Sequence, residues 1–474
     1  MSATVAPHAP PAGPTPPGPG LASLSTLRPL VDTCVHCGFC LPTCPSYLVL
    51  GQEMDSPRGR VYLMRAAIEQ RTTLDGPMRE HIDTCLGCLA CVTACPSGVQ
   101  YGPLIEATRS AIEAQASRAP ADRLLRRLLF ALLPFPGRLR LVSWSMGLAR
   151  IVQRWPTWMA LLPPRLRALI ALAPAAASSH DVAERTSAHG TTRRQVGLIT
   201  GCVQRVFFGD VNEATVRVLV SEGCDVVAPS TQGCCGALSL HTGQMEDARR
   251  FARQLIEVFD RYAVDTIVIN AAGCGSTLKE YGHLLGDDPA WADRARRFSA
   301  KVRDVTEVLA ELPPVAPRHP LPLRIAYHDA CHLAHGQGVR REPRAVLTAI
   351  PGTTIVPIPE SEICCGSAGV FNLLQPEMAG ALGRRKAEHI RSTDADLVVT
   401  SNPGCMLQIQ ASLTPGSLPR SLTPGSLPRS LTPGSLPRSS QPSRRSVPVR
   451  HIVEVVDASI RGIGPSELTR RGHA

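Results

Sequence analysis

The chain has 474 residues, which is enough for two to four domains, and its net charge of +11 comes almost entirely from arginine. Its aromatic share of 4% and the lack of a recognisable nucleic-acid-binding motif argue against a nucleic-acid partner. No run of ~18 uncharged apolar residues is present, so we expect no transmembrane helix.

The first 115 residues divide into two segments. Residues 1–24 are rich in proline and are predicted to be disordered, without the apolar stretch of a secretory signal. Residues 25–115 are predicted to form a ferredoxin-like domain. We expect helices to dominate there, because metal clusters replace much of the apolar core, and we predict one of these helices at Arg60–Ile68.

Eight cysteines of this domain form two copies of the pattern Cys-x2-Cys-x2-Cys-x3-Cys-Pro. This is the bacterial ferredoxin spacing for two [4Fe–4S] clusters, in which the fourth cysteine of each motif ligates the other cluster. The expected ligands are Cys34, Cys37, Cys40 and Cys95 for cluster I, and Cys85, Cys88, Cys91 and Cys44 for cluster II. Zinc also suits a single Cys-x2-Cys, but two full copies favour iron–sulfur. Thiolate clusters need a reducing compartment, so a cytoplasmic location is expected.

Residues 116–192 form a leucine- and arginine-rich helical region that ends in a polar linker. Its tryptophans are Trp144, Trp155 and Trp158. Basic amphipathic helices with tryptophan can lie on a membrane surface, here the cytoplasmic face of the inner membrane. The simpler interpretation is that these helices pack on the rest of the protein or on a partner subunit. Both interpretations stay open.

The remainder of the chain is an internal repeat that its cysteines reveal. The first copy contains Cys202, Cys234, Cys235 and Cys274, and the second contains Cys331, Cys364, Cys365 and Cys405. Corresponding cysteines lie about 130 residues apart, and such constant spacing indicates two copies of one domain.

Predicted strands precede these cysteines in both copies. They are Val196–Thr200, Asp225–Pro229 and Asp265–Asn270 in the first copy, and Arg324–Tyr327, Thr354–Ile358 and Asp396–Thr400 in the second. Helical patterns such as Ala248–Phe259 fill the gaps, so residues 193–315 and 322–465 are predicted to be two α/β domains with parallel sheets. Ligands of such sheets bind beyond the carboxyl ends of the strands, so the four cysteines of each copy should meet at one edge.

An insertion interrupts the second copy. Residues 412–438 are three identical copies of a nine-residue unit with two prolines, which predicts a solvated loop. The segment His451–Val456 is predicted to be the last strand, and residues 466–474 to be a tail.

The eight cysteines of the two copies are candidate ligands for a soft metal centre. Iron–sulfur, zinc and a redox disulfide all suit such sets. The alternative is that they are buried structural thiols. Adjacent Cys-Cys pairs followed by glycine, repeated in register, argue against that alternative.

The pattern Cys…Cys-Cys-Gly…Cys resembles the cysteine-rich "CCG" domain of heterodisulfide reductases and of iron–sulfur subunits of flavin-linked dehydrogenases. Three further segments, Asp55–Arg60, Tyr327–Gly338 and Ser401–Cys405, are similar to the glycolate oxidase (glycolate dehydrogenase) iron–sulfur subunit family of bacteria. The resemblance spans roughly residues 25–411 and 448–465, and the string from His328 to Gly338 is its most specific part.

The resemblance implies an electron-transfer subunit without glycolate oxidation of its own. In that family a flavoprotein subunit oxidises glycolate to glyoxylate, a second flavin-domain subunit accompanies it, and the iron–sulfur subunit passes electrons towards quinone. The chain lacks a convincing Gly-x-Gly-x-x-Gly fingerprint, so flavin is expected on partner subunits only. The alternatives are the corresponding subunit for lactate or anaerobic glycerol-3-phosphate oxidation, an autonomous disulfide reductase, and a structural zinc scaffold.

One departure from the heterodisulfide reductase pattern limits the resemblance. Its final Cys-x2-Cys is replaced by Ala271-x2-Cys274 in the first copy and by Asn402-x2-Cys405 in the second. Each copy thus offers four thiolates instead of five, which puts a noncubane double cluster in doubt and leaves one ordinary cluster per copy, or none.

Several polar side chains near the motifs are candidates for a supporting role. They are His328, Asp329, His332 and His335, and Arg58 and Arg60. The histidines could serve in acid–base chemistry, but hydrogen bonding around the cysteine sulfurs is favoured. The arginines are expected either over a cluster or a partner carboxylate, or in a solvated charge pair.

Overall fold

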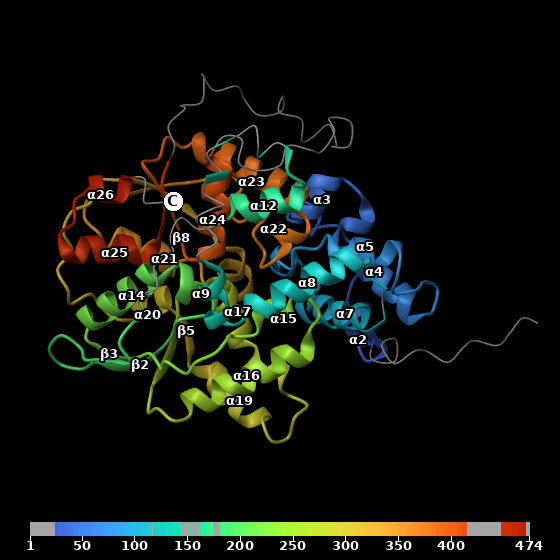
Figure 1. Ribbon diagram of the computed structural model, residues 1–474, viewed down its shortest axis with the longest axis horizontal. Coiled ribbons are helices and arrows are strands. Elements are labelled where there is room, and N and C mark those ends of the chain that lie inside the picture. The colour runs from blue at the N-terminus through green and yellow to red at the C-terminus, as the bar shows by residue number, and fades with distance from the viewer. Residues whose placement is uncertain are drawn as a thin grey trace, which may run out of the picture.

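The computed structural model describes residues 24–115, 117–143, 151–152, 155, 159, 161–173, 181–414 and 447–470. Figure 1 shows the N-terminal helical unit (blue) beside two α/β units, with the first (green to yellow) below the second (orange to red). The arrangement is the multidomain fold that the sequence predicts. No helix among the described residues is long and apolar enough to cross a membrane.

The N-terminal unit is built from short helices, and no strand occurs among its described residues 24–115. The elements are α2 (Arg28–Asp32), α3 (Pro45–Leu50), η1 (Glu53–Asp55), α4 (Pro57–Ile68), α5 (Pro77–Asp83), α6 (Ala90–Thr93) and α7 (Tyr101–Gln115). The predicted helix at Arg60–Ile68 is confirmed as part of α4. Its start is fixed by Ser56, whose hydroxyl accepts a hydrogen bond from the Gly59 amide at 3.0 Å, and by Pro57 in the first turn.

Three described helices follow in the leucine- and arginine-rich region. They are α8 (Pro120–Leu132), α9 (Pro136–Ser143) and α12 (Pro164–Ala171). On α8, Leu129 is buried against Val370 and Leu374 of the last α/β unit. Leu124 and Leu128 on the same helix are 60% and 51% exposed. One face of α8 therefore packs on the protein, as the simpler interpretation expects, while another face presents leucine to the surface.

The first α/β unit contains a five-stranded sheet in the order β1-β3-β2-β4-β5. Its strands are β1 (Arg185–Thr186), β2 (Arg194–Ile199), β3 (Cys224–Val227), β4 (Thr266–Ile269) and β5 (Val302–Asp304). All neighbouring pairs are parallel except β1 with β3. The helices are α13 (Val203–Phe207), α14 (Gly209–Ser221), α15 (Ala237–Leu240), α16 (Met245–Phe259), α17 (Ala272–Lys279), α18 (Tyr281–Leu284), α19 (Ala292–Lys301) and α20 (Val305–Glu311).

The second unit repeats this topology with four parallel strands in the order β7-β6-β8-β9. The strands are β6 (Arg324–His328), β7 (Thr354–Val356), β8 (Leu397–Thr400) and β9 (Val449–His451). The helical elements are η2 (His332–Gly336), α21 (Glu342–Thr348), α22 (Phe371–Leu374), α23 (Pro376–Arg391), α24 (Pro403–Leu413), α25 (Ile452–Arg461) and α26 (Pro465–Thr469). The internal repeat is therefore a repeat of one fold.

The prediction of a final strand at His451–Val456 is wrong. Strand β9 ends at His451, and helix α25 begins at the next residue. His451 and Glu454 form a capping box, and Ile452, Val453, Val455 and Val456 are buried on one side of the helix. β-branched residues suggested a strand, but their spacing also suits one face of a helix.

The predicted insertion at 412–438 lies largely outside the described residues. Its first two residues complete the last turn of α24.

A common core joins the two α/β units. Helix α14 of the first packs on α25 of the second, and buried residues of both sheets belong to one apolar cluster. Beside this contact, the Arg217 guanidinium donates to both carboxylate oxygens of Asp457, at 3.0 Å and 2.8 Å. The relative position of the two sets of cysteines is thus fixed by packing.

Candidate metal centres

The cysteines of the N-terminal unit meet around two small cavities. One cavity of about 30 Å³ is lined by Cys34, Cys37, Cys40 and Cys95, together with Cys91. The other, of about 20 Å³, is lined by Cys44, Cys85, Cys88 and Cys91. The fourth cysteine of each motif lies with the other motif's first three, which is the grouping that exchanged ligands require. The individual ligand assignment stays a prediction.

Loop geometry brings each triplet of cysteines together. His36 and Gly38 between the first cysteines have φ angles of 55° and 87°, and Gly87 and Leu89 in the second motif have 65° and 62°. These left-handed residues turn the backbone between successive cysteines. Four converging thiols match the donor set of a [4Fe–4S] cluster, so the residues present fit the group.

Arg60 is fully buried beside the second set. Its Nη1 lies 4.0 Å from the Cys44 sulfur, and it donates to the Ser46 hydroxyl and the His81 carbonyl at 2.9 Å and 2.6 Å. Burial opposes ionisation of the Cys85 thiol, but the charges of Arg60 and Arg109 together lower its pKa. Arg60 therefore takes the first of the two expected places, against a cluster site.

Arg58 takes a different place. It pairs with Glu53 at 2.6 Å and donates to the His36 carbonyl at 3.0 Å, while lining the first cavity. The Arg58 side chain thus holds the first cysteine loop by binding the backbone carbonyl of His36.

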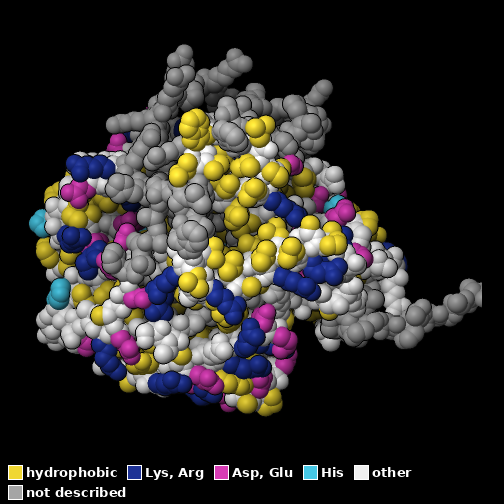
Figure 2. All heavy atoms as spheres, in the orientation of Figure 1, with side chains coloured by type: hydrophobic (Ala, Val, Ile, Leu, Met, Phe, Trp, Pro, Cys, Tyr) yellow, Lys and Arg dark blue, Asp and Glu magenta, His cyan; other side chains and the backbone are white. Residues whose placement is uncertain are grey.

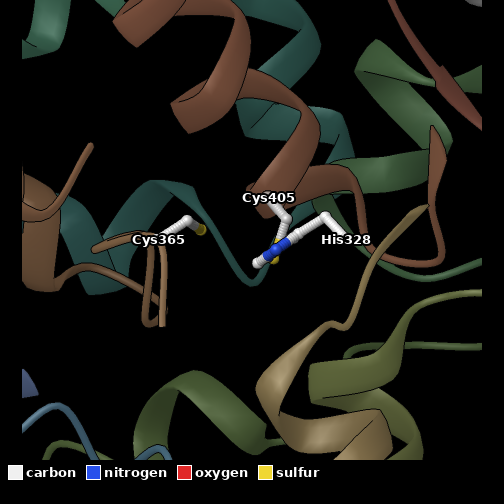
Figure 3. A group of neighbouring side chains, drawn as sticks. All are labelled: His328, Cys365 and Cys405. Carbon is white, nitrogen blue, oxygen red and sulfur yellow. The ribbon is translucent and has the colours of Figure 1, made fainter. Parts of the chain in front are cut away.

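The four cysteines of the second α/β unit gather at the carboxyl edge of its sheet. The Cys331 and Cys364 sulfurs lie 3.8 Å apart. Cys365, Cys405 and His328 bring one ligand atom each within 4.8 Å of one another. In Figure 3 the Cys365 side chain points towards Cys405 and the His328 ring. Two thiols and an imidazole at this spacing, with two more thiols alongside, suit a soft metal centre.

Positive and polar groups surround this second set. Lys386 on α23 is 3% exposed, and its ammonium group donates to the carbonyls of Glu360 and Ser361. Burial lowers the pKa of Lys386, and the neighbouring Cys365 and Cys364 act in the opposite direction. Asn402 donates from Nδ2 to the Cys405 sulfur at 3.3 Å. A cation and an amide donor thus lie beside the thiols of the second set.

The four cysteines of the first α/β unit also meet at the edge of their sheet. The Cys202 and Cys234 sulfurs lie 3.5 Å apart, and all four cysteines line one cavity. At two positions the neighbours here are apolar. Strand register places Ile199 where the second unit has His328. Ala248 and Ala379 pack on the glycine after each Cys-Cys pair, which places Leu255 where the second unit has Lys386. Ile199 and Leu255 are fully buried.

The second set lies against the N-terminal unit. Cys88 belongs to the same buried cluster as Cys331 and Cys364. His332 hydrogen-bonds through Nε2 with the Gly87 carbonyl at 3.0 Å, and its ring meets the ring of His241 edge-on at 4.9 Å. Thiols of cluster II and of the second unit thus belong to one buried cluster.

The first unit touches the same junction through Arg109. Its guanidinium donates to the carbonyls of His241 and Cys85, the former at 2.7 Å. The two units are also linked next to their own cysteines, because the Gly273 amide donates to Asn402 Oδ1 at 3.4 Å. Three sets of cysteines therefore converge on one junction.

Of the four candidate polar residues in the histidine string, only His328 lies in the group with Cys365 and Cys405. Asp329 pairs with Arg344 at 2.8 Å. His335 hydrogen-bonds with the Thr93 hydroxyl at 2.6 Å and, like His332, ties the second unit to the N-terminal unit. Thus one histidine lies near the sulfurs, and two connect the second unit to the N-terminal unit.

Sequence reasoning missed Lys386, Arg109 and His241. Lys386 had a usable signal, since it is one of three lysines and lies within a helix of the repeat. The other two act across domain boundaries, which no local pattern reveals.

Comparison with known proteins agrees with this architecture. The chain matches the model of the 4Fe-4S dicluster domain over residues 30–99 and that of the cysteine-rich domain over 196–279 and 325–410. It is 36% identical over 396 residues to the "Probable glycolate oxidase iron-sulfur subunit" of Bacillus subtilis (strain 168), covering 80% of this chain and 88% of the relative. The chain belongs to the family of glycolate oxidase iron–sulfur subunits.

Two further relatives show that similar chains carry names from glycolate and from lactate metabolism. The "Glycolate oxidase iron-sulfur subunit" of Escherichia coli (strain K12) is 34% identical over 391 residues, covering 81% of this chain and 90% of the relative. "Lactate utilization protein A" of Geobacillus thermodenitrificans (strain NG80-2) is 31% identical over 216 residues, covering 45% and 90%. The chain is an iron–sulfur electron-transfer subunit of an oxidoreductase with two [4Fe–4S] clusters.

Proposed function

We propose that this subunit carries electrons from glycolate, oxidised to glyoxylate on a flavoprotein partner, to a quinone-type acceptor. The observation that carries the proposal is that Cys88 of the dicluster domain shares one buried cluster with Cys331 and Cys364 of the second cysteine-rich domain. Iron–sulfur clusters take up and release electrons singly, so sets of ligands packed in one cluster can form a relay.

Electrons enter this relay at cluster I. Cys37 is exposed, and the flanking Val35 and Phe39 are 67% and 66% exposed. Apolar side chains exposed beside a redox centre suit the docking of a protein partner, because their burial stabilises the complex close to the cluster. The flavoprotein subunit is the partner that the relay requires at this end.

Substrate choice belongs to the flavoprotein. Glycolate is the first candidate because both full-length relatives carry glycolate oxidase in their names. Lactate is the second, supported by the shorter relative from Geobacillus. We place the complex in the cytoplasm, peripheral to the inner membrane where a quinone is available.

The test combines the chain, purified without oxygen, with its flavoprotein partner. Adding glycolate should bleach the visible absorption of the clusters and produce the EPR signals of reduced [4Fe–4S] centres. The chain alone should show neither change with glycolate. Bleaching by lactate but not by glycolate would move the assignment to the lactate alternative, and bleaching by neither would overturn the proposal.

A further inference from the structure

A cavity of about 280 Å³ opens at the four thiols of the first cysteine-rich domain. It is far larger than the cavities at the dicluster cysteines, which measure about 30 and 20 Å³. Its apolar walls are formed by Leu133, Leu172, Phe207, Leu238, Leu373 and Leu407. An apolar cavity of this size that reaches four sulfurs is more than a cluster site needs, and such cavities are typical of sites for small apolar ligands.

The walls come from three parts of the chain. Leu133 and Leu172 belong to the leucine- and arginine-rich region. Phe207 belongs to the first cysteine-rich domain, and Leu373 and Leu407 belong to the second. None of the four cysteines of the second domain lines the cavity. The cavity is therefore specific to one of the two duplicated sets.

One side of the cavity leads to an apolar surface. Leu169 on α12 lines the cavity and is 47% exposed, and the neighbouring Leu161 and Leu166 are 82% and 43% exposed. Figure 2 shows hydrophobic side chains gathered over α8 and α12, with arginine and lysine side chains beside them. An apolar ligand can therefore approach from an apolar surface, and arginines at its rim suit anionic lipid head groups.

Two polar atoms in the cavity wall lack a hydrogen-bond partner among the described residues. They are Nε2 of His241 and Oε1 of Gln204, which is 4% exposed. The other ring nitrogen of His241 lies 3.2 Å from Glu106. Buried polar atoms are normally paired, so these two match a ligand that offers both oxygen acceptors and hydroxyl donors.

We infer that this cavity binds the head group of a lipid-soluble quinone, which makes the first cysteine-rich domain the site where electrons leave the subunit. The inference rests on the proposed function for its electron supply. Oxidation of one glycolate to glyoxylate releases two electrons and two protons at the flavoprotein. One quinone takes up two electrons through the subunit and two protons from solvent, with His241 placed to hydrogen-bond to a ring oxygen, and becomes a quinol.

Photolabelling locates the site directly. The subunit, loaded with clusters and in complex with its flavoprotein, is irradiated with an azido-ubiquinone, with and without excess decylubiquinone. We expect competed label in peptides covering residues 161–173 and 202–208. Competed label around Phe39, on the flavoprotein, or at none of these places would overturn the inference.

Variants of α12 measure the affinity. Leu172→Trp fills the cavity. We expect the concentration of decylubiquinone that halves the labelling by azido-ubiquinone to rise by roughly tenfold or more in this variant. Leu169→Trp is a second variant at a half-exposed position, in case the first one fails to load clusters. Leu141→Trp, at a residue on α9 that is 72% exposed and outside the cavity, is the control, and decylubiquinone should protect this variant from labelling as it protects the unaltered chain.

The two failures are distinguishable. If glycolate does not bleach the clusters of the unaltered complex, the proposed function fails. If glycolate bleaches them, but decylubiquinone protects both cavity variants from labelling as well as it protects the control, only the quinone site is wrong.

Discussion

The two cysteine-rich domains share a strand order and four cysteines each, yet their surroundings differ. The four thiols of the second set are buried, two of them share a buried cluster with Cys88, and His328 and Lys386 lie beside the set. The first set has Ile199 and Leu255 at those two positions and opens on a cavity. Duplication kept the thiols and changed their neighbours. We therefore assign the second set to electron transfer inside the subunit and the first set to the site where electrons leave it.

The largest expected effect comes from breaking the internal set. Cys331→Ser should abolish glycolate-dependent quinone reduction, because it removes a thiol of the buried cluster that the second set shares with Cys88. Bleaching of the dicluster centres by glycolate should remain. Stopped-flow absorption and quinone assays separate the two steps.

The matched control for this variant is Cys224→Ser. Cys224 is a fully buried thiol of the sheet core and belongs to neither set. It should keep both reactions. If Cys331→Ser also kept both, the second domain would not lie on the electron path.

A second test concerns the inlet at cluster I. Phe39→Ser should weaken binding of the flavoprotein by roughly tenfold, about 1.4 kcal/mol, since an exposed aromatic side chain at an interface centre is a common hot spot. Calorimetric titration of the two purified proteins gives the dissociation constant. Leu141→Ser, at a residue 72% exposed on α9, is the control and should leave this affinity unchanged. Equal affinity for the Phe39 variant would place the flavoprotein elsewhere.

The charge difference between the sets predicts a shift in potential. Lys386→Leu gives the second set the residue type found at Leu255 and removes a cation near Cys364 and Cys365. The midpoint potential of a centre on these thiols should fall by on the order of 60 mV, a tenfold change for one electron. EPR-monitored redox titration measures the shift.

Lys301→Leu is the control, since this side chain binds the Val264 carbonyl at 2.9 Å, remote from the cysteines. An unshifted potential in the Lys386 variant would mean that Lys386 does not compensate thiolate charge.

The smallest effect concerns the residues that end the last strand of each sheet. Asp304 caps α20 as His451 caps α25. Burial raises the pKa of Asp304 from 3.8 to about 7. The folded chain therefore keeps a proton that the unfolded chain loses, so this contribution to stability is present below pH 4 and is lost as the pH rises to 7.

Between pH 5.5 and 7 the contribution of Asp304 to the free energy of unfolding should fall by on the order of 1 kcal/mol per pH unit. Asp304→Asn keeps the capping oxygen and should remove this dependence on pH. Burial lowers the pKa of His451 to about 4, so its contribution has the opposite sign between pH 4 and 6.5. Denaturant unfolding of the unaltered chain and of the Asp304→Asn variant at several pH values measures this dependence. The same dependence on pH in both proteins would contradict the account.

Local patterns were enough for the three strands of each copy that precede cysteines and for the cysteine sets, but not for β1, β5 and β9. Strands such as β4 and β8 are buried apolar runs that end before a cysteine, and the repeat fixes their order. The helix α25 was misassigned because, over only six positions, its β-branched residues suit a strand as well as one face of a helix. Its capping box, His451 with Glu454, was the signal that could have decided.

The outlet could not be predicted from the sequence. Its walls come from α12, the first domain and the second domain, and their meeting depends on tertiary packing. The same holds for Asn402, which the sequence marks only as a missing cysteine. In the structure it connects the Cys405 sulfur to Gly273 of the other domain.

Reoxidation of the isolated subunit tests the central claim most directly. The chain is reduced chemically without its flavoprotein, freed of reductant, and mixed with decylubiquinone in a stopped-flow instrument. If the subunit carries its own outlet, the cluster absorption returns and quinol forms with no other protein present. Return of the absorption only after the flavoprotein is added would place the quinone site on the partner and contradict the account.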